Sequence, residues 1–262
     1  MSTKQPRDQR IGITETSDPC FHLDIFRRLY KGNIIITKRL TNKLIEKLVD
    51  HKDKIILHLS VTGMGNSVIE PFVPSVEETH KKFLELIEKG FPIDHVVLRV
   101  DPIVPTDKGL ETATSVLRAF SGLGIPRVRI SFLDNYHHVR KRFSDANIKE
   151  LYEGNFHAPF YLRNHYLKLF IKAANENGFN VIETCGEPNM ESTPCLSQKD
   201  IDILGLTDEI KLEGSAEQRT HCKCPSNKSE LIREKPTQCQ HKCMYCYWKT
   251  EVKKYVTKDA MP

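Results

Sequence analysis

The sequence predicts an α/β protein with a parallel sheet, on two observations. Up to about residue 184, short apolar runs rich in isoleucine and valine alternate with segments of helical periodicity. Such near-continuous apolar runs are typical of parallel strands that are covered on both faces. Six βα units follow one another in this way, which favours either a parallel barrel or a doubly wound sheet.

The predicted strands are short and separated by helical segments of ordinary length. They are residues 10–14, 33–37, 54–62, 95–100, 127–133 and 180–184.

The predicted helices lie between these strands. The clearest follows Ser75, which has Glu78 three residues later as in a capping box, and ends at Gly90. Its apolar positions, expected to form a buried stripe, are Val76, Phe83, Leu84 and Ile87. The other helices are expected at about residues 22–31, 41–50, 110–124, 161–178 and 197–206.

The character of the chain changes after residue 188, where it becomes polar, proline-bearing and rich in cysteine. This stretch cannot build a core of its own, so we expect metal sites to hold it in place. The organisation predicted is a barrel-like part, residues 1–187, and a cysteine-rich extension, residues 188–262, within one structural domain.

Composition narrows the class of protein. The chain has 262 residues, of which 39% are hydrophobic and 28% charged, as in soluble globular proteins. No apolar run approaches the roughly 18–20 residues of a membrane span, and the polar start shows no secretory signal. We therefore expect a cytoplasmic protein with no membrane partner, in a reducing compartment where cysteines serve as metal ligands or catalytic groups. The net charge of +5 permits an anionic partner without requiring one.

The ends of the predicted strands carry the candidate active-site residues, because chemistry in parallel α/β barrels sits at the carboxyl ends of the strands. Arg99 and Asp101 come directly after an apolar run and point to the same side, and Lys38 has a similar position; these three are the candidate catalytic groups. The candidate cofactor-binding residues are Thr14, Lys38, Thr62, Gly63, Arg99, Ser131, Glu183 and Tyr245. Neither GxGxxG nor GxxxxGK[ST] occurs where it would indicate a dinucleotide or P-loop site.

Seven of the eight cysteines fall in the last third of the chain, and Cys20 stands alone. Three of them, Cys239, Cys243 and Cys246, form a CxxxCxxC motif. This spacing is poor for zinc, although His221 or His241 could complete such a site. Three close thiolates suit a 4Fe–4S cluster whose fourth iron stays open for a ligand.

The motif CQHKCMYC resembles the signature of the radical S-adenosylmethionine superfamily, here at the end of the chain instead of after the first strand. The resemblance extends to an uncharacterised branch with a C-terminal motif. It rests on TGMGNSVIEPFVPS, LRVDPIVPTD, ISFLDNY, ETCGE and CMYCYW, and spans roughly residues 10–248. The superfamily's GGE-like stretch after the second strand is replaced by TKRL, so its usual contacts to S-adenosylmethionine transfer poorly.

The resemblance implies a fold and a chemistry. The fold is a partial parallel (β/α)6 barrel of the TIM-like kind, with the extension closing over its mouth. The cofactors are S-adenosylmethionine and a catalytic 4Fe–4S cluster, which together yield a 5′-deoxyadenosyl radical that abstracts hydrogen from a substrate. An electron donor such as flavodoxin or ferredoxin is the expected partner, and Arg99 or Lys38 could pair with the cofactor carboxylate.

The other four late cysteines are expected to form a second metal site. They are Cys185, Cys195, Cys222 and Cys224, and they could hold an auxiliary 4Fe–4S cluster or a structural zinc. The basic, aromatic stretch at residues 136–143 is either a solvated helix face or a guide for an anionic substrate, such as a nucleotide or nucleic-acid base. The alternative function is that of a zinc-stabilised nucleic-acid-binding protein without catalysis.

Overall fold

One parallel sheet forms the centre of the computed structural model, which describes residues 6–148, 152, 156–216, 221–233 and 239–248. Within these residues seven strands pair in the order β6-β5-β4-β3-β2-β1-β7, and every pairing is parallel. The predicted α/β class is therefore confirmed. The strands are β1 (Ile11–Ile13), β2 (Asn33–Thr37), β3 (Ile55–Ser60), β4 (Val96–Ile103), β5 (Arg127–Phe132), β6 (Ile182–Thr184) and β7 (Lys228–Glu230).

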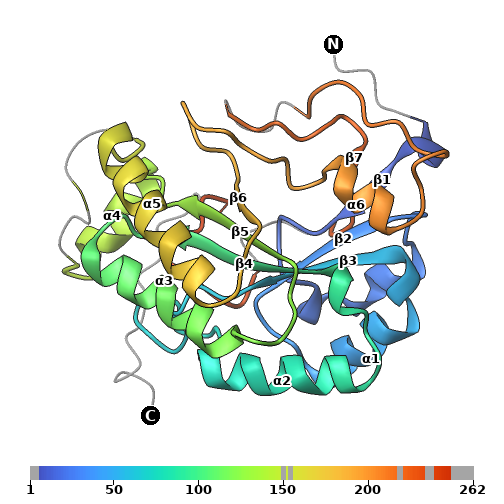
Figure 1. The fold of residues 1–262 in the computed structure, drawn as a ribbon, viewed down its shortest axis with the longest axis horizontal. Helices are drawn as coiled ribbons and strands as arrows, with labels where there is room; N and C mark the ends of the chain where they lie inside the picture. The colour runs from blue at the N-terminus through green and yellow to red at the C-terminus, as the bar shows by residue number, and fades with distance from the viewer. Residues whose placement is uncertain (1–5, 149–151, 153–155, 217–220, 234–238, 249–262) are drawn as a thin grey trace.

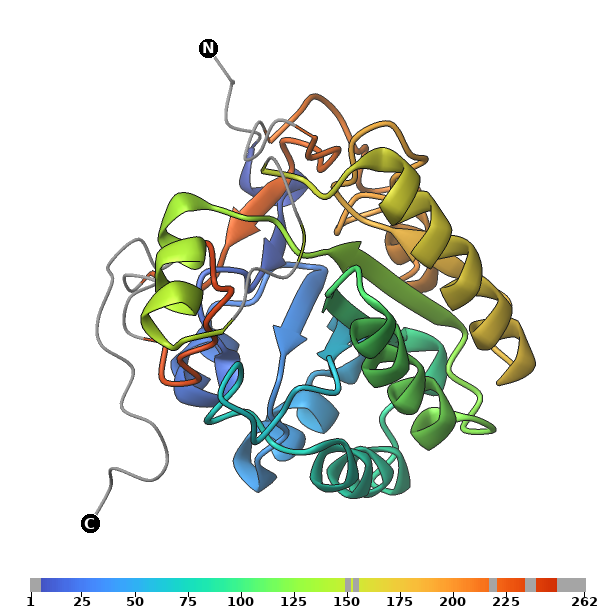
Figure 2. The same ribbon diagram turned by 90° about the vertical axis from the view of Figure 1, so that its left-hand side faces the viewer.

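The sheet remains open, since β6 and β7 are its two edges and do not pair with each other. All six predicted strands are present, but the count of six was wrong because β7 lies inside the extension. Figure 2 shows β7 beside β1, joined in register from Ile11 and Lys228 onward. The sequence KSE of β7 has no apolar run, so no periodic signal marked it as a strand.

In the described part of the chain, four helices cover the outer face of the sheet and stand at predicted places. They are α1 (Asn42–Asp50), α2 (Val76–Glu88), α3 (Asp107–Phe120) and α5 (Phe160–Glu176). A further helix, α4 (His137–Asp145), stands in the basic stretch 136–143 and packs its Val139 and Phe143 with Leu133 and Met244. The capping box of Ser75 and Glu78 at the start of α2 is present. The first expected helix, at 22–31, is wrong: two short 3-10 turns, Pro19–Phe21 and Leu23–Arg27, stand there instead.

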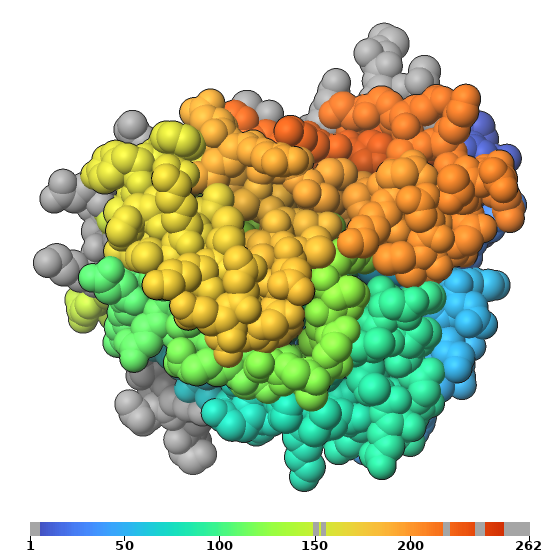
Figure 3. Space-filling model, in the orientation of Figure 1, coloured from blue at the N-terminus to red at the C-terminus, as the bar shows by residue number. Residues whose placement is uncertain are grey.

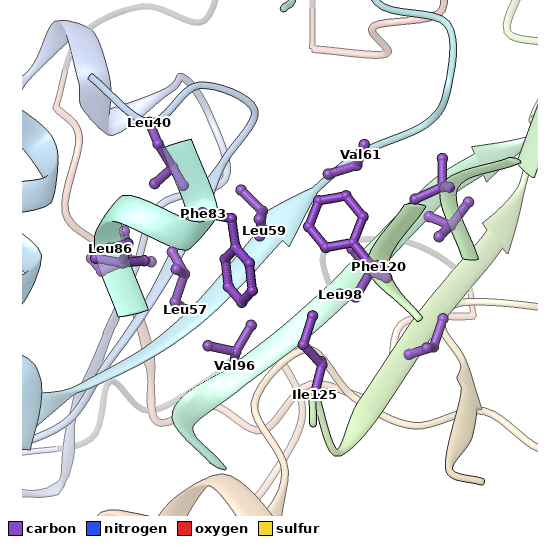
Figure 4. Close-up of a cluster of buried hydrophobic side chains, with 14 of the residues drawn as sticks. Leu40, Leu57, Leu59, Val61, Phe83, Leu86, Val96, Leu98, Phe120 and Ile125 are labelled. Atoms are coloured by element: carbon purple, nitrogen blue, oxygen red, sulfur yellow. The ribbon is translucent and has the colours of Figure 1, made fainter. Parts of the chain in front are cut away.

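The main core lies between the outer helices and the sheet. Figure 4 shows Phe83 of α2 and Phe120 of α3 packed over Leu57 and Leu98 of the central strands. The expected stripe of α2 was wrong at Leu84, which is 44% exposed, whereas Leu86 is fully buried. The reason is rotation of the helix, since Phe83 and Leu86 are three residues apart and share the face turned to the sheet.

The inner face of the sheet is covered by the extension. Its short helix α6 (Gln198–Ile203) and the loop after it bring Leu196, Ile201, Leu206 and Ile210 against Ile11, Ile13, Ile34, Ile56 and Val97. Arg127 of β5 pairs with Asp200 of α6 at 2.8 Å, with neither side chain exposed. The extension was expected to close over the mouth of the barrel. In the structure it also packs against the inner face of the sheet. In Figure 3 this segment, coloured orange, covers the upper part of the molecule.

Candidate functional site at the carboxyl edge of the sheet

A pocket of about 210 Å³ lies where the strands end. Strands β1 to β6 each supply a side chain at or just beyond their carboxyl end, as expected for parallel α/β proteins. The predicted residues that line it are Thr14, Lys38, Arg99, Asp101, Ser131, Tyr245 and the seven late cysteines.

Three predicted cofactor-binding residues are not among the described residues lining the pocket, and each has another role. Thr62 donates a hydrogen bond to Glu70. Gly63 has a φ of +82°, and a β-carbon there would lie 2.6 Å from the carbonyl oxygen of Thr112, so both backbone and space require glycine. Glu183 pairs with the buried Arg129 at 2.6 Å.

The CxxxCxxC loop lies over this pocket and is fixed by its backbone. Cys243 is buried, while Cys239 and Cys246 are half-buried. Arg142 of α4, itself 1% exposed, donates hydrogen bonds to the carbonyl oxygens of Met244 (2.6 Å) and Cys246 (3.0 Å). The basic stretch 136–143 thus turns one of its arginines inward to hold the cysteine loop, which neither earlier interpretation of that stretch had anticipated.

His241 anchors the other end of the loop. Its Nε2 lies 2.8 Å from the Asp18 carboxylate, and its Nδ1 lies 3.1 Å from the carbonyl oxygen of Phe72. Both ring nitrogens face acceptors, so His241 could bind a metal only by giving up one of these two contacts. Burial opposes ionisation of Asp18, yet the charge of His241 and hydrogen bonds from His241 and the amides of Lys38 and Cys20 lower its pKa to about 2.

A buried ion pair supports the centre of the loop. Glu70, which has no exposed surface, accepts hydrogen bonds from Lys38 Nζ (3.0 Å), Thr62 and the hydroxyl of Tyr245. Lys38 also donates to Ser60 at 3.2 Å. Burial opposes the charge of Lys38, but Glu70 raises its pKa. The predicted catalytic lysine is thus already paired. Sequence reasoning missed Glu70; its only signal was an acid between Ile69 and Phe72 in an otherwise apolar turn.

Arg99 and Asp101 form a second paired group on the wall of the pocket. Arg99 Nε donates to Asp101 at 2.6 Å, so the two side chains do share one side of β4. A second contact runs from Arg99 Nη1 to Cys195 Sγ at 3.7 Å. Burial opposes the charge of Arg99, and Asp101 together with the cysteines raises its pKa. The pair therefore places a positive charge between Asp101 and the second cysteine set.

The structure brings the second cysteine set, Cys185, Cys195, Cys222 and Cys224, together at the end of β6. Cys185 Sγ and Cys195 Sγ are 3.3 Å apart, and the amide of Cys195 donates to Cys224 Sγ at 3.3 Å. Hydrogen bonds from Cys185 and Cys224 lower the pKa of Cys195, aided by the charges of Arg99 and Arg129. A hydrogen bond from Cys224 similarly lowers the pKa of Cys222 to about 6. The same hydrogen bonds, together with burial, raise the pKa of Cys185 and Cys224. Two of the four cysteines thus favour the thiolate, the form that binds metal, and the other two would have to lose a proton to a bound metal.

The spacing of the sulfur atoms constrains what the cysteines could hold. Among the described residues, only Asp18, Cys20 and His241 have three ligand atoms all within 4.8 Å of one another. No three of the late cysteines meet that limit. Two thiolates on one zinc ion would lie about 3.8 Å apart, given Zn–S bonds of about 2.3 Å. A set that fails this limit for three atoms suits a cluster in which each thiolate binds a different iron. Within the second set, however, sulfurs lie in close pairs, Cys185 with Cys195, Cys195 with Cys224, and Cys222 with Cys224, and such pairs suit zinc.

Fold and site together define a parallel α/β protein with a cysteine-lined pocket at the carboxyl edge of its sheet. The chain belongs to the DUF1848 family, a domain of unknown function, whose model matches residues 28–248. No curated protein and no solved structure matches the chain. Across the described residues, no helix combines the length and the apolar character needed to cross a bilayer.

Proposed function

We propose that this protein is a radical S-adenosylmethionine enzyme whose catalytic 4Fe–4S cluster is held by Cys239, Cys243 and Cys246. The observation that carries the proposal is the position of these three cysteines. They lie on the same pocket as the carboxyl ends of β1 to β6, although their motif is the last element of the chain. Three thiolates leave one iron open for a cofactor in that pocket.

In the superfamily that the motif resembles, such a cluster supplies the electron that cleaves S-adenosylmethionine to a 5′-deoxyadenosyl radical, which abstracts hydrogen from substrate. The protein's own residues would position this chemistry. Arg142 and His241 fix the cysteine loop by its carbonyls and through Asp18. Arg99 and Lys38 keep positive charge at the pocket wall, where a cofactor carboxylate could exchange with their present partners Asp101 and Glu70.

The second cysteine set would hold the extension against the sheet and form the opposite wall of the pocket. An auxiliary 4Fe–4S cluster and a structural zinc are both proposals for it. No three of its sulfurs lie within 4.8 Å of one another, which suits the cluster, whereas its close pairs, such as Cys185 and Cys195 at 3.3 Å, suit zinc. An electron donor such as flavodoxin or ferredoxin would be needed to reduce the catalytic cluster.

The proposal is tested by purifying the protein without oxygen and measuring iron, acid-labile sulfide and zinc. Iron is expected, together with formation of 5′-deoxyadenosine from S-adenosylmethionine under reducing conditions. The variant Cys243→Ala should lose that product, whereas Cys20→Ala should retain it because Cys20 is not among the described residues lining the pocket.

Two outcomes would contradict the proposal. Persistent cleavage in Cys243→Ala would show that the wrong cysteines had been assigned to the cluster. A colourless, zinc-loaded protein that binds DNA with a steep salt dependence would instead support the alternative, a zinc-stabilised nucleic-acid-binding protein.

A further inference from the structure

Three aromatic rings form a stack on the wall of the pocket. The rings of Tyr136 and Tyr247 are 5.7 Å apart and 19° from parallel, and those of Tyr247 and Trp248 are 5.0 Å apart and 29° from parallel. All three side chains line the pocket and are half-buried. The stack is therefore part of the pocket surface, and none of its three rings is in the buried core.

The stack is assembled from two distant parts of the chain. Tyr136 comes just after β5 and caps the start of α4. Tyr247 and Trp248 directly follow Cys246, and Arg142 holds the backbone of that loop. The ring of Phe156 meets Tyr136 edge-on at 4.5 Å, which fixes the tilt of Tyr136. The rings are thus oriented by the fold itself, so little ordering would remain to be done when a ligand binds.

A carboxylate lies close to the stack in sequence and on the same pocket. Asp134 precedes Tyr136 by two residues and lines the pocket. His157 Nδ1 lies 2.7 Å from Asp134 Oδ1, which orients the carboxylate. Carboxylates at the ends of parallel strands commonly accept hydrogen bonds from ribose hydroxyls, and flat aromatic side chains stack on bases of any sequence.

We infer that Tyr136, Tyr247, Trp248 and Asp134 form a nucleoside subsite, in which the base lies against the aromatic stack and the ribose hydroxyls bond to Asp134. The ligand could be a nucleoside portion of the substrate or the adenosine of S-adenosylmethionine. For the second of these sources the inference rests on the proposed function. For the first it narrows the unknown substrate to one that contains a nucleoside.

The test uses the full-length protein with its native metal, kept without oxygen and titrated with adenosine by calorimetry. Trp248 is the sole tryptophan, so its fluorescence gives a second, local signal. We expect saturable binding, a change in tryptophan emission, and about tenfold weaker binding of 2′,3′-dideoxyadenosine. Replacing Asp134→Asn should shrink the difference between the two nucleosides.

The variants Tyr136→Leu and Trp248→Leu keep apolar volume but remove the flat ring, so each should weaken adenosine binding about tenfold. Trp248→Phe should restore most of it. Tyr161→Leu is the matched control, because Tyr161 is 73% exposed and is not among the described residues lining the pocket. Metal content and circular dichroism of each variant show whether the fold is retained.

Competition separates the two sources of the nucleoside. If S-adenosylmethionine displaces adenosine, the subsite holds the cofactor; if both bind together, it holds the substrate. The inference is overturned if adenosine does not bind, or binds equally well to both leucine variants. If the unchanged protein binds adenosine and loses that binding in Trp248→Leu, but holds no iron and does not cleave S-adenosylmethionine, the proposed function alone is rejected. If the unchanged protein cleaves S-adenosylmethionine but binds no adenosine, or binds it equally well in both leucine variants, the subsite alone is rejected.

Discussion

The inward-pointing Arg142 offers a direct test of how the cysteine loop is held. In Arg142→Met the carbonyl oxygens of Met244 and Cys246 lose both hydrogen bonds, at 2.6 and 3.0 Å. Hydrogen bonds from a charged donor contribute about 1.5–3 kcal/mol each, so the two together amount to about 3–6 kcal/mol. We expect the free energy of unfolding to fall by about that amount.

The measurement is denaturant unfolding of the metal-loaded protein, with iron content determined on the same samples. The control is Lys141→Met on the same helix, since the exposed pair of Lys141 with Asp145 should contribute at most about 1 kcal/mol. We also expect Arg142→Met to lose iron bound at the CxxxCxxC loop. A variant that matches Lys141→Met in both stability and iron content would refute the role given to Arg142.

Three further changes test other parts of the structure. Asp18→Asn should remove the stability that the lowered pKa of Asp18 provides. That stability is present above the ordinary pKa of 3.8 and is lost as the pH falls toward 2. The variant should therefore have a free energy of unfolding about 2 kcal/mol lower at pH 7, and that free energy should change less between pH 4 and 2 than in the unchanged protein. Cys195→Ala should lose only the metal of the second set, leaving the iron bound through Cys243, and an unchanged total metal content would contradict the four-cysteine site. Leu231→Ala should lower the free energy of unfolding by about 2–5 kcal/mol, because Leu231 lies beside β7 and is 2% exposed. Leu169→Ala, at an exposed position, should lower it far less. Equal melting temperatures of the two variants would count against β7 as part of the sheet.

Much of the fold was readable from the sequence because its strands are apolar throughout. Residues 33–37 form β2 with the predicted bounds, and the helix at 76–88 begins at the predicted capping box. Prediction from hydrophobic periodicity fails for elements whose sequence has no apolar pattern. The polar β7 pairs with β1 through backbone hydrogen bonds, which any side chain permits, and α6 fills the inner face of the sheet that was expected to be closed by the barrel itself.

The candidate site also has a part that the sequence predicts and a part that it does not. Local spacing sufficed to single out Cys239, Cys243 and Cys246 as one group, because close ligands must lie near each other in space. The partners of the loop that carries them are distant in sequence: Asp18 lies 223 residues before His241, and Arg142 lies 102 residues before Met244. No local pattern could connect these residues.

The sequence by itself determined that this protein has a parallel α/β fold, with a three-cysteine motif near its end and polar groups at its strand ends. Hydrophobic periodicity and ligand spacing are local properties, so they can be seen in the sequence. Only the tertiary structure decided that Lys38 pairs with Glu70, that Arg142 faces inward, and that all seven late cysteines share one pocket. Those facts depend on which buried charges meet across the fold, since a buried charge must find its partner wherever the packing places one.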